Sequence, residues 1–137
     1  PRLIVLWGTN LASQPTLGPS LKAAKRRGAH LITIDVRESE AAELSDRLIP
    51  IRPATDAALA LAMMHVITGE ELHDPEFVTK HTVGFEALVK HVRQYSPEWA
   101  APITGAFATC QRFWRMEWAT TCGSRKLLTW MSRSCDV

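Results

Sequence analysis

The sequence lacks any apolar stretch long enough to span a membrane, and no signal peptide is visible in it. It also lacks a charge imbalance: 16 Lys and Arg against 14 Asp and Glu leave a net charge of +2, too small to indicate nucleic-acid binding. The glycine-rich phosphate motifs of P-loop and typical dinucleotide-binding proteins are missing. With 46% hydrophobic and 22% charged residues, the 137 residues have the composition of one globular domain.

Cysteine is scarce, and its three residues, Cys110, Cys122 and Cys135, all lie in the last 28 positions. Their spacing matches no zinc or iron–sulfur pattern, and an odd number favours free thiols of a reducing compartment over a disulfide framework. The same region has no steady apolar period. We therefore expect an α/β domain over residues 1–109 and an atypical tail over residues 110–137, either disordered or foreign to the fold.

The fold prediction starts from Leu3–Trp7, an unbroken apolar run that stops at Gly8. Such a run without alternation predicts a central strand of a parallel sheet, buried on both faces. A helix starting at Pro19 or Ser20 and ending at Gly28 leads to a second strand, Leu31–Ile34, which completes a βαβ unit. A short helix over 38–44 precedes a third strand, Leu48–Ile51, which Pro50 restricts to a sheet edge or a bulge.

Helices alone are predicted beyond this point. Ala57–Thr68 is apolar nearly all round, so we expect a buried helix, capped by Thr55 or Asp56. The further helices open at Asp74–Pro75, at Phe85, at Ser96–Pro97 with Trp99 inward, and at Thr104, the last running to Thr120. The predicted fold class is α/β: a Rossmann-like parallel sheet with flanking helices over residues 1–69, followed by a helical C-terminal half.

Three loops follow the predicted strands: Gly8-Thr9-Asn10, Asp35-Val36-Arg37 and Pro53-Ala54-Thr55-Asp56. Because the carboxyl ends of parallel strands share one edge, we expect these loops to converge, with a set of polar groups that suits a nucleotide. Gly8 allows close approach of a phosphate, which Thr9 and Asn10 can bind. Asp35 follows the second strand, the place where the carboxylate of a doubly wound fold accepts from ribose hydroxyls. The Arg37 guanidinium can bind a phosphate or a carboxylate through two hydrogen bonds. Asp56 can accept from two adjacent N–H donors, as guanine offers.

Each of these residues also has a purely structural interpretation. Gly8 suits a turn, Asn10 an Asx-turn, and Thr55 and Asp56 a helix N-cap, while Asp35 can cap the next helix or pair with Arg37. Only the coincidence of all three loops favours a site. The five histidines are scattered and share no strand end, so they predict no triad and no metal site: His30, His65, His73, His81 and His91.

The same segments resemble the molybdopterin oxidoreductases, the superfamily of dimethyl sulfoxide reductase, formate dehydrogenase and nitrate reductase. The resemblance rests on Leu-Trp-Gly-Thr-Asn, Arg-Arg-Gly-Ala, Ile-Asp-x-Arg-x-Ser-Glu-x-Ala and Pro-Ile-Arg-Pro-x-Thr-Asp-Ala-Ala-Leu. His-Thr-Val-Gly-Phe-Glu and Tyr-Ser-Pro-Glu-Trp-Ala-Ala-Pro-Ile-Thr-Gly extend it to about residue 109. Two positions depart from the family pattern: Val36 replaces its usual proline, and Ala54 replaces a glycine, which would resist a positive φ.

The resemblance implies one of two domains that hold a bis(molybdopterin guanine dinucleotide) cofactor with molybdenum. The guanosine diphosphate arm of one pterin would lie on the loops Trp7 to Asn10, Asp35 to Arg37 and Ala54 to Asp56. The residues expected to bind it are Trp7, Gly8, Thr9, Asn10, Asp35, Arg37, Ala54, Thr55 and Asp56. An iron–sulfur cluster and the molybdenum ligand belong to family regions that this sequence lacks.

We therefore expect a fragment of a molybdenum-dependent oxidoreductase, which has no activity alone and whose partners are the missing domains of a parent enzyme. The chain begins almost inside its first strand, without an initiator methionine, which also indicates a fragment. An apolar face left exposed by missing domains would favour self-association. The compartment, cytoplasmic or periplasmic, stays open. The alternative is a non-catalytic α/β module that binds an ordinary nucleotide or a protein through the same edge.

Overall fold

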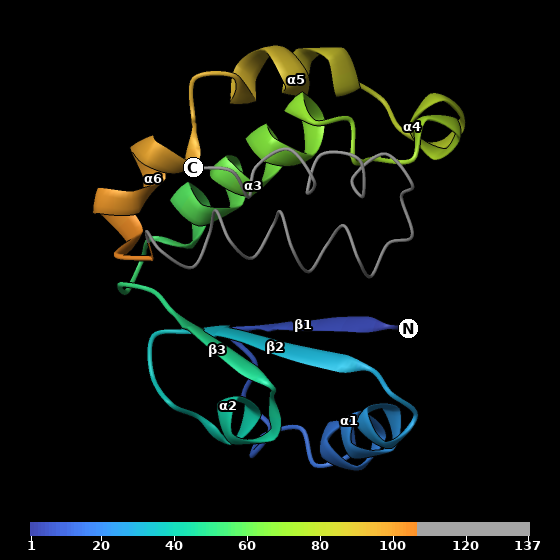
Figure 1. Cartoon of the computed structure of the whole chain (residues 1–137), viewed down its shortest axis with the longest axis vertical. Coiled ribbons are helices and arrows are strands. Elements are labelled where there is room, and N and C mark those ends of the chain that lie inside the picture. The colour runs from blue at the N-terminus through green and yellow to red at the C-terminus, as the bar shows by residue number, and fades with distance from the viewer. Residues whose placement is uncertain (107–137) are drawn as a thin grey trace, which may run out of the picture. The chain divides into compact units, whose positions relative to one another are not determined.

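The computed structural model of the chain describes residues 1–106. In this part the elements follow the order shown in Figure 1. The strands and helices are β1 (Leu3–Trp7), α1 (Leu17–Arg26), β2 (His30–Asp35), α2 (Glu40–Leu44), β3 (Arg47–Pro50), α3 (Asp56–Gly69), α4 (Pro75–His81), α5 (Phe85–Val92) and α6 (Pro97–Thr104). They fall into two compact units, one over Pro1–Pro53 and one that begins at Ala54.

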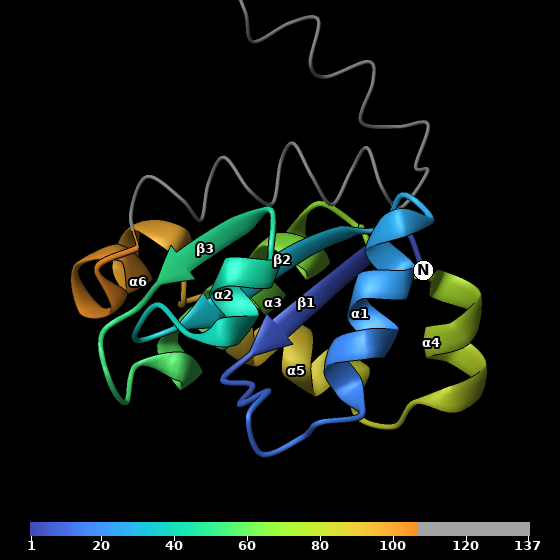
Figure 2. The ribbon, with the colours of Figure 1, turned by 90° about the horizontal axis from the view of Figure 1, so that it is seen from below.

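The first unit is a parallel sheet of strand order β1-β2-β3, with α1 and α2 on one face of it (Figures 1 and 2). Leu6 pairs with Thr33 across β1 and β2, and Ile34 pairs with Ile49 across β2 and β3. The predicted α/β class, with parallel strands and flanking helices, is confirmed.

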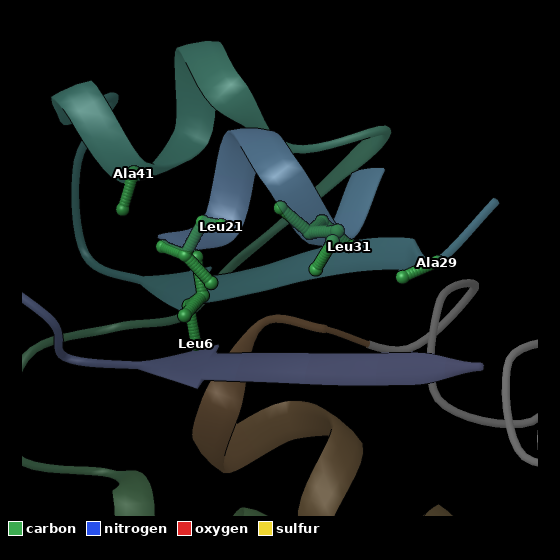
Figure 3. Packing of buried hydrophobic residues seen from close by; sticks show 6 residues of the cluster. Leu6, Leu21, Ala29, Leu31 and Ala41 are labelled. Carbon is green, nitrogen blue, oxygen red and sulfur yellow. The ribbon is translucent and has the colours of Figure 1, made fainter. Parts of the chain in front are cut away.

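The core of this unit lies between the sheet and the two helices (Figure 3). Leu6, Leu21, Leu31 and Ala41 meet there from β1, α1, β2 and α2, and each is at most 5% exposed. The burial of these apolar side chains is the main force that fixes α1 and α2 on the sheet, at roughly 1.5–3 kcal/mol for each large side chain.

The central strand is β2, and the prediction that Leu3–Trp7 is central was wrong. Within the described residues β1 pairs only with β2, and its residues other than Leu6 are half-buried. In β2, by contrast, Leu31 faces the helices while Ile32 and Ile34 face the opposite side, and all three are at most 1% exposed. An apolar run predicts that both faces of a strand are covered, but it does not predict how many strands pair with that strand.

Proline positions explain two further boundaries. The first helix begins at Leu17, earlier than predicted, because Pro19 fits within a first turn, where its missing N–H is not needed. Directly before β3, Asp46 N–H donates to Leu31 O of β2 (2.8 Å). Every second residue of the strand donates to the same neighbour, so residue 50 would be a later donor of this ladder, but Pro50 has no N–H. Ile51 N–H donates to Asp35 O (3.1 Å) in its place. Within residues 1–106 β3 lies at an edge of the sheet, which is one of the two placements, edge or bulge, predicted for it.

In the second unit, α3 packs against α5 and α6. The predicted division at residue 69 was wrong, because α3 belongs to this unit and the sheet unit ends at Pro53. The prediction that this helix is buried was also too strong: only Ala58, Leu59 and Ala62 are buried, and most other positions are half-buried. Its even distribution of apolar residues does not reveal which face is covered.

The shorter helices begin where their caps predict. The Asp74 carboxylate accepts from Glu76 N–H and Phe77 N–H (2.9 and 3.0 Å), and the Ser96 hydroxyl accepts from Trp99 N–H (3.3 Å). Trp99 itself is 38% exposed, so the prediction that it points inward was wrong. The rest of the predicted helix over 104–120, the cysteines and the predicted tail over 110–137 lie outside the described residues.

Candidate functional site

The ends of β1 and β2 lie side by side at the carboxyl edge of the sheet. Trp7 pairs with Ile34, and Gly8 N–H extends the ladder by donating to Ile34 O (2.9 Å). Neighbouring strands are about 4.8 Å apart, so the loop from Trp7 to Asn10 and the loop from Asp35 to Arg37 leave the sheet next to each other. The structure thus brings together two of the three loops that the sequence predicts to form a site.

Gly8 makes the turn that starts the first loop. Its φ is +57°, in the left-handed region that glycine adopts without strain, and a Cβ added there would meet no atom within 4 Å. The glycine is therefore required for the backbone angle rather than for space inside the unit. Since its N–H is already bonded to Ile34 O, this amide is not free to bind a ligand.

Thr9 and Asn10 supply the next polar groups of the loop. The Asn10 side-chain oxygen accepts from Ala12 N–H (3.1 Å), which is the Asx-turn considered from the sequence, and the Thr9 hydroxyl donates to Trp7 O at 3.5 Å. The backbone N–H groups of Thr9 and Asn10 have no acceptor within residues 1–106. These two amides are donors that an anion can use.

Asp35 holds the second loop. Its Oδ1 accepts from Val36 N–H (2.7 Å) and Arg37 N–H (3.3 Å), and its Oδ2 accepts from the Ser39 hydroxyl (3.4 Å). The carboxylate neither caps α2, which begins at Glu40, nor forms an ion pair with the Arg37 guanidinium. Arg37 is exposed, and its side chain has no partner in the described part of the chain.

The third loop begins the second unit. Ala54 has a φ of +62°, a left-handed conformation that is unfavourable for a residue with a Cβ. Thr55 O accepts from Ala58 N–H (3.1 Å) and Leu59 N–H (3.2 Å), and Asp56 is the first residue of α3 and exposed. The convergence of this loop with the other two stays a prediction.

A separate cleft of about 430 Å³ lies in the first unit, between α1 and α2. Leu11, Ala12 and Leu44 line it with Gly18, and the charged Lys22, Glu40 and Glu43 stand around it. None of the nine predicted site residues borders this cleft. This cleft is therefore not the candidate site.

A group of charged side chains lies around Asp46, near the start of β2. The Asp46 carboxylate meets Lys25 Nζ (2.8 Å), His30 Nδ1 (3.2 Å) and Leu31 N–H (2.9 Å). Burial raises the pKa of Asp46, but the hydrogen bond from Leu31 and the nearby charges of Lys25 and His30 outweigh it, so the pKa lies below its ordinary value. Sequence reasoning missed this group, because no local motif joins residues 15 to 21 positions apart.

Two further findings concern the described residues as a whole. No group of three or more His, Cys, Asp or Glu side chains in residues 1–106 is arranged to hold a metal ion. None of the helices in the same range is long and apolar enough to cross a membrane.

The family is decided by comparison with known proteins. The family model of molybdopterin oxidoreductases matches residues 1–120. The chain belongs to this family. The resemblance deduced from the loop motifs is thereby confirmed, and with it the expectation of a molybdopterin cofactor with molybdenum.

Individual relatives agree with this assignment. The chain is 43% identical over 108 residues to the "Probable oxidoreductase YoaE" of Bacillus subtilis, and 48% identical over 107 residues to the acetylene hydratase of Syntrophotalea acetylenica. These alignments cover 76% and 77% of the chain but only 15% of each relative. A solved structure of acetylene hydratase from Pelobacter acetylenicus matches 85% of the chain and 17% of its own length, with a TM-score of 0.72 and 36% identity.

Proposed function

We propose that this chain supplies part of the binding site for a molybdopterin guanine dinucleotide, and that it holds the guanosine diphosphate arm of one pterin. The site consists of the nine residues of the three loops: Trp7, Gly8, Thr9, Asn10, Asp35, Arg37, Ala54, Thr55 and Asp56. In the complete enzyme the cofactor would be a bis(molybdopterin guanine dinucleotide), and an iron–sulfur cluster would lie in other regions.

The observation that carries the proposal is the set of free anion-binding groups at the carboxyl edge of β1 and β2. Thr9 and Asn10 offer two backbone N–H groups without an acceptor in residues 1–106, and Arg37 offers an exposed guanidinium without a partner there. A diphosphate needs such donors, and in open α/β sheets ligands bind at this edge. The residues present therefore fit the phosphate part of the group that the family implies.

The guanine end is assigned to the third loop. Asp56 is exposed and carries two carboxylate oxygens, which can accept from the ring N–H and the amino group of guanine. The positive φ of Ala54 supports the correspondence with the family glycine at this position, because a backbone that demands φ near +60° favours glycine.

The activity of the whole protein is a separate proposal. The chain spans about 15% of the length of the curated relatives it matches, and their names include an oxidoreductase and a hydratase, so this segment does not fix the reaction. When bound, molybdenum supplies oxygen-atom or hydride-type redox chemistry. We propose that residues 1–109 orient this cofactor as one domain of an oxidoreductase, with the missing domains as partners, and that the chain alone is inactive.

Inosine diphosphate provides a sharp test, because it differs from GDP at the base only by the absence of the amino group. We expect a thermal-shift titration to show stabilisation in the order GDP, then inosine diphosphate, then ADP and NAD, since a ligand that binds only the folded state raises its stability. In Asp56→Ala the difference between the two purine diphosphates should disappear, while Glu76→Gln, an exposed carboxylate elsewhere in the second unit, should keep it.

A preference for ADP or NAD would contradict the guanine assignment. It would favour the alternative of a module for an ordinary nucleotide. No shift with any nucleotide at millimolar concentration would contradict binding by this chain.

A further inference from the structure

The loop after β2 is closed at both ends by one side chain. Asp35, the last residue of the strand, accepts from two backbone amides at the start of the loop, Val36 N–H (2.7 Å) and Arg37 N–H (3.3 Å). Its other oxygen accepts from the hydroxyl of Ser39 (3.4 Å), which is 5% exposed and directly precedes α2. The carboxylate therefore bridges the loop from the strand that it leaves to the helix that it enters.

These three contacts use most of the capacity of the carboxylate. An ionised aspartate offers about four lone-pair sites, and three of them already have donors from the protein. The shortest contact is the one to Val36 N–H at 2.7 Å, a distance typical of a strong charge-assisted bond. Little capacity is left for a ribose hydroxyl, which is the partner expected for this residue from the sequence.

In contrast to the Asp35 carboxylate, the Arg37 guanidinium makes no contact that holds it within the described residues. The backbone N–H of Arg37 is bound to Asp35, but its side chain is exposed and has no hydrogen bond or ion pair in residues 1–106. It lies in the loop beside the first one, where the N–H groups of Thr9 and Asn10 also lack acceptors. Among the residues of these two loops, Trp7 to Asn10 and Asp35 to Arg37, the cationic side chain is thus a guanidinium, which matches phosphate oxygens in pairs.

We propose that Asp35 is a positioning residue and that Arg37 is the residue that binds a phosphate of the nucleotide. This inference rests on the proposed function, since it divides the roles within that site. Asp35 fixes the backbone of the loop, and through the loop it fixes the point from which the guanidinium reaches the ligand. The carboxylate itself does not contact the ribose.

A double-mutant cycle on the full 137-residue chain separates the two roles. GDP affinity is measured by calorimetry for the wild type, Asp35→Ala, Arg37→Ala and the double variant. We expect each single variant to lose about 10-fold or more in affinity, as for one lost hydrogen-bonded charge. The double variant should be no weaker than Arg37→Ala, because a positioning residue has no effect once the group that it positions is gone.

Guanosine is the matched ligand, because it keeps the ribose and the base but has no phosphate. The affinity for guanosine should be unchanged in both single variants. If the Asp35 carboxylate bound the ribose, Asp35→Ala would weaken the binding of guanosine as well as that of GDP. Arg37→Lys keeps the charge and should recover part of the GDP affinity. The steepness with which GDP binding weakens in salt should fall in Arg37→Ala.

Losses that add up in the double variant, or a loss of guanosine binding in Asp35→Ala, would overturn the proposed roles. A melting temperature within the error of the wild type shows that Asp35→Ala still folds. If it does not fold, Ser39→Ala, which removes one of the three contacts, replaces it in the same cycle. A wild type that binds ADP as well as GDP would contradict the proposed function instead, so the two failures are distinguishable.

Discussion

In the sheet unit, over residues 1–53, local polar contacts such as those of Asp35 occur together with a group around Asp46 that joins residues far apart in the sequence. In the described part of the helical unit most side-chain polar contacts are local. Asp46 reaches Lys25, 21 positions away, and His30, 16 positions away. In the helical unit Asp74 caps its own first turn, and Lys80 pairs with Glu76 one turn earlier. The comparison teaches that short motifs determine the caps of the helical unit, whereas the contacts of Asp46 depend on the tertiary fold of the sheet unit.

The largest expected effect is on the core of the sheet unit. Leu31→Ala removes a side chain that is 0% exposed between β2 and the two helices, and we expect a loss of about 2–5 kcal/mol in the free energy of unfolding. Leu88→Ala is the control in the helical unit, since Leu88 is 37% exposed and should lose much less. Denaturant unfolding followed by circular dichroism measures both. Equal losses would contradict the burial difference.

The contacts of Asp46 should have the second largest effect. Asp46→Ala leaves Leu31 N–H and the side chains of Lys25 and His30 without this partner, and we expect a loss of about 1–2 kcal/mol, since the carboxylate is 29% exposed. Glu76→Gln removes the exposed local ion pair with Lys80 and should change stability by less than about 0.5 kcal/mol. Chemical denaturation at neutral pH measures both variants. Similar losses in the free energy of unfolding would contradict the difference between the contacts of Asp46 and the local ion pair of Glu76.

The contribution of Asp46 to the free energy of unfolding should decrease at acidic pH. Because the pKa of Asp46 is lower in the folded chain than its ordinary value of 3.8, its stabilisation is fully present above that value. The stabilisation is lost as the pH falls through the lowered folded pKa. The difference in unfolding free energy between wild type and Asp46→Ala should therefore shrink on acidification. A difference that stays constant down to pH 2 would show that the charge of Asp46 does not stabilise the fold.

A smaller effect, of opposite direction, is expected at the first residue of the helical unit. Ala54→Gly relieves a left-handed backbone at φ +62° and should stabilise the chain by about 1 kcal/mol, since this conformation costs about 1–2 kcal/mol for a residue with a Cβ. Ala57→Gly makes the same change inside α3 and should destabilise it by about 1 kcal/mol. A melting temperature that moves in the same direction for both variants would refute the strain at Ala54.

The local cap should give an effect of similar or smaller size. Asp74→Ala removes the acceptor for two amides of α4, which has no buried residue, so the loss should be about 0.5–2 kcal/mol and confined to this helix. Hydrogen exchange resolved by residue should show faster exchange in α4 with little change in β2. Asp74→Asn, which keeps an acceptor oxygen, should retain most of the protection. Equal acceleration in β2 would show that the cap stabilises more than its own helix.

The sequence by itself determined the parallel α/β class, the starts of α4 and α6 and the family. These features depend on signals within a few residues: an apolar run that ends at Gly8, a cap followed by proline at Asp74 and Ser96, and the loop motifs. The family resemblance placed a glycine at position 54, where alanine was expected to resist a positive φ, and the structure nevertheless gives Ala54 a φ of +62°.

The tertiary structure alone decided which strand is central, which helix belongs to which unit, and what Asp46 contacts. β1 has the more apolar sequence of the two strands, and only pairing shows that β2 is the one with a neighbour on each side in the described residues. The Asp35 carboxylate, expected to accept from a ribose, instead accepts from groups of its own loop. Local sequence patterns indicate which residues of a segment are buried and where a helix begins. Residues that only the fold brings into contact have no characteristic spacing in the sequence, so no local pattern predicts them.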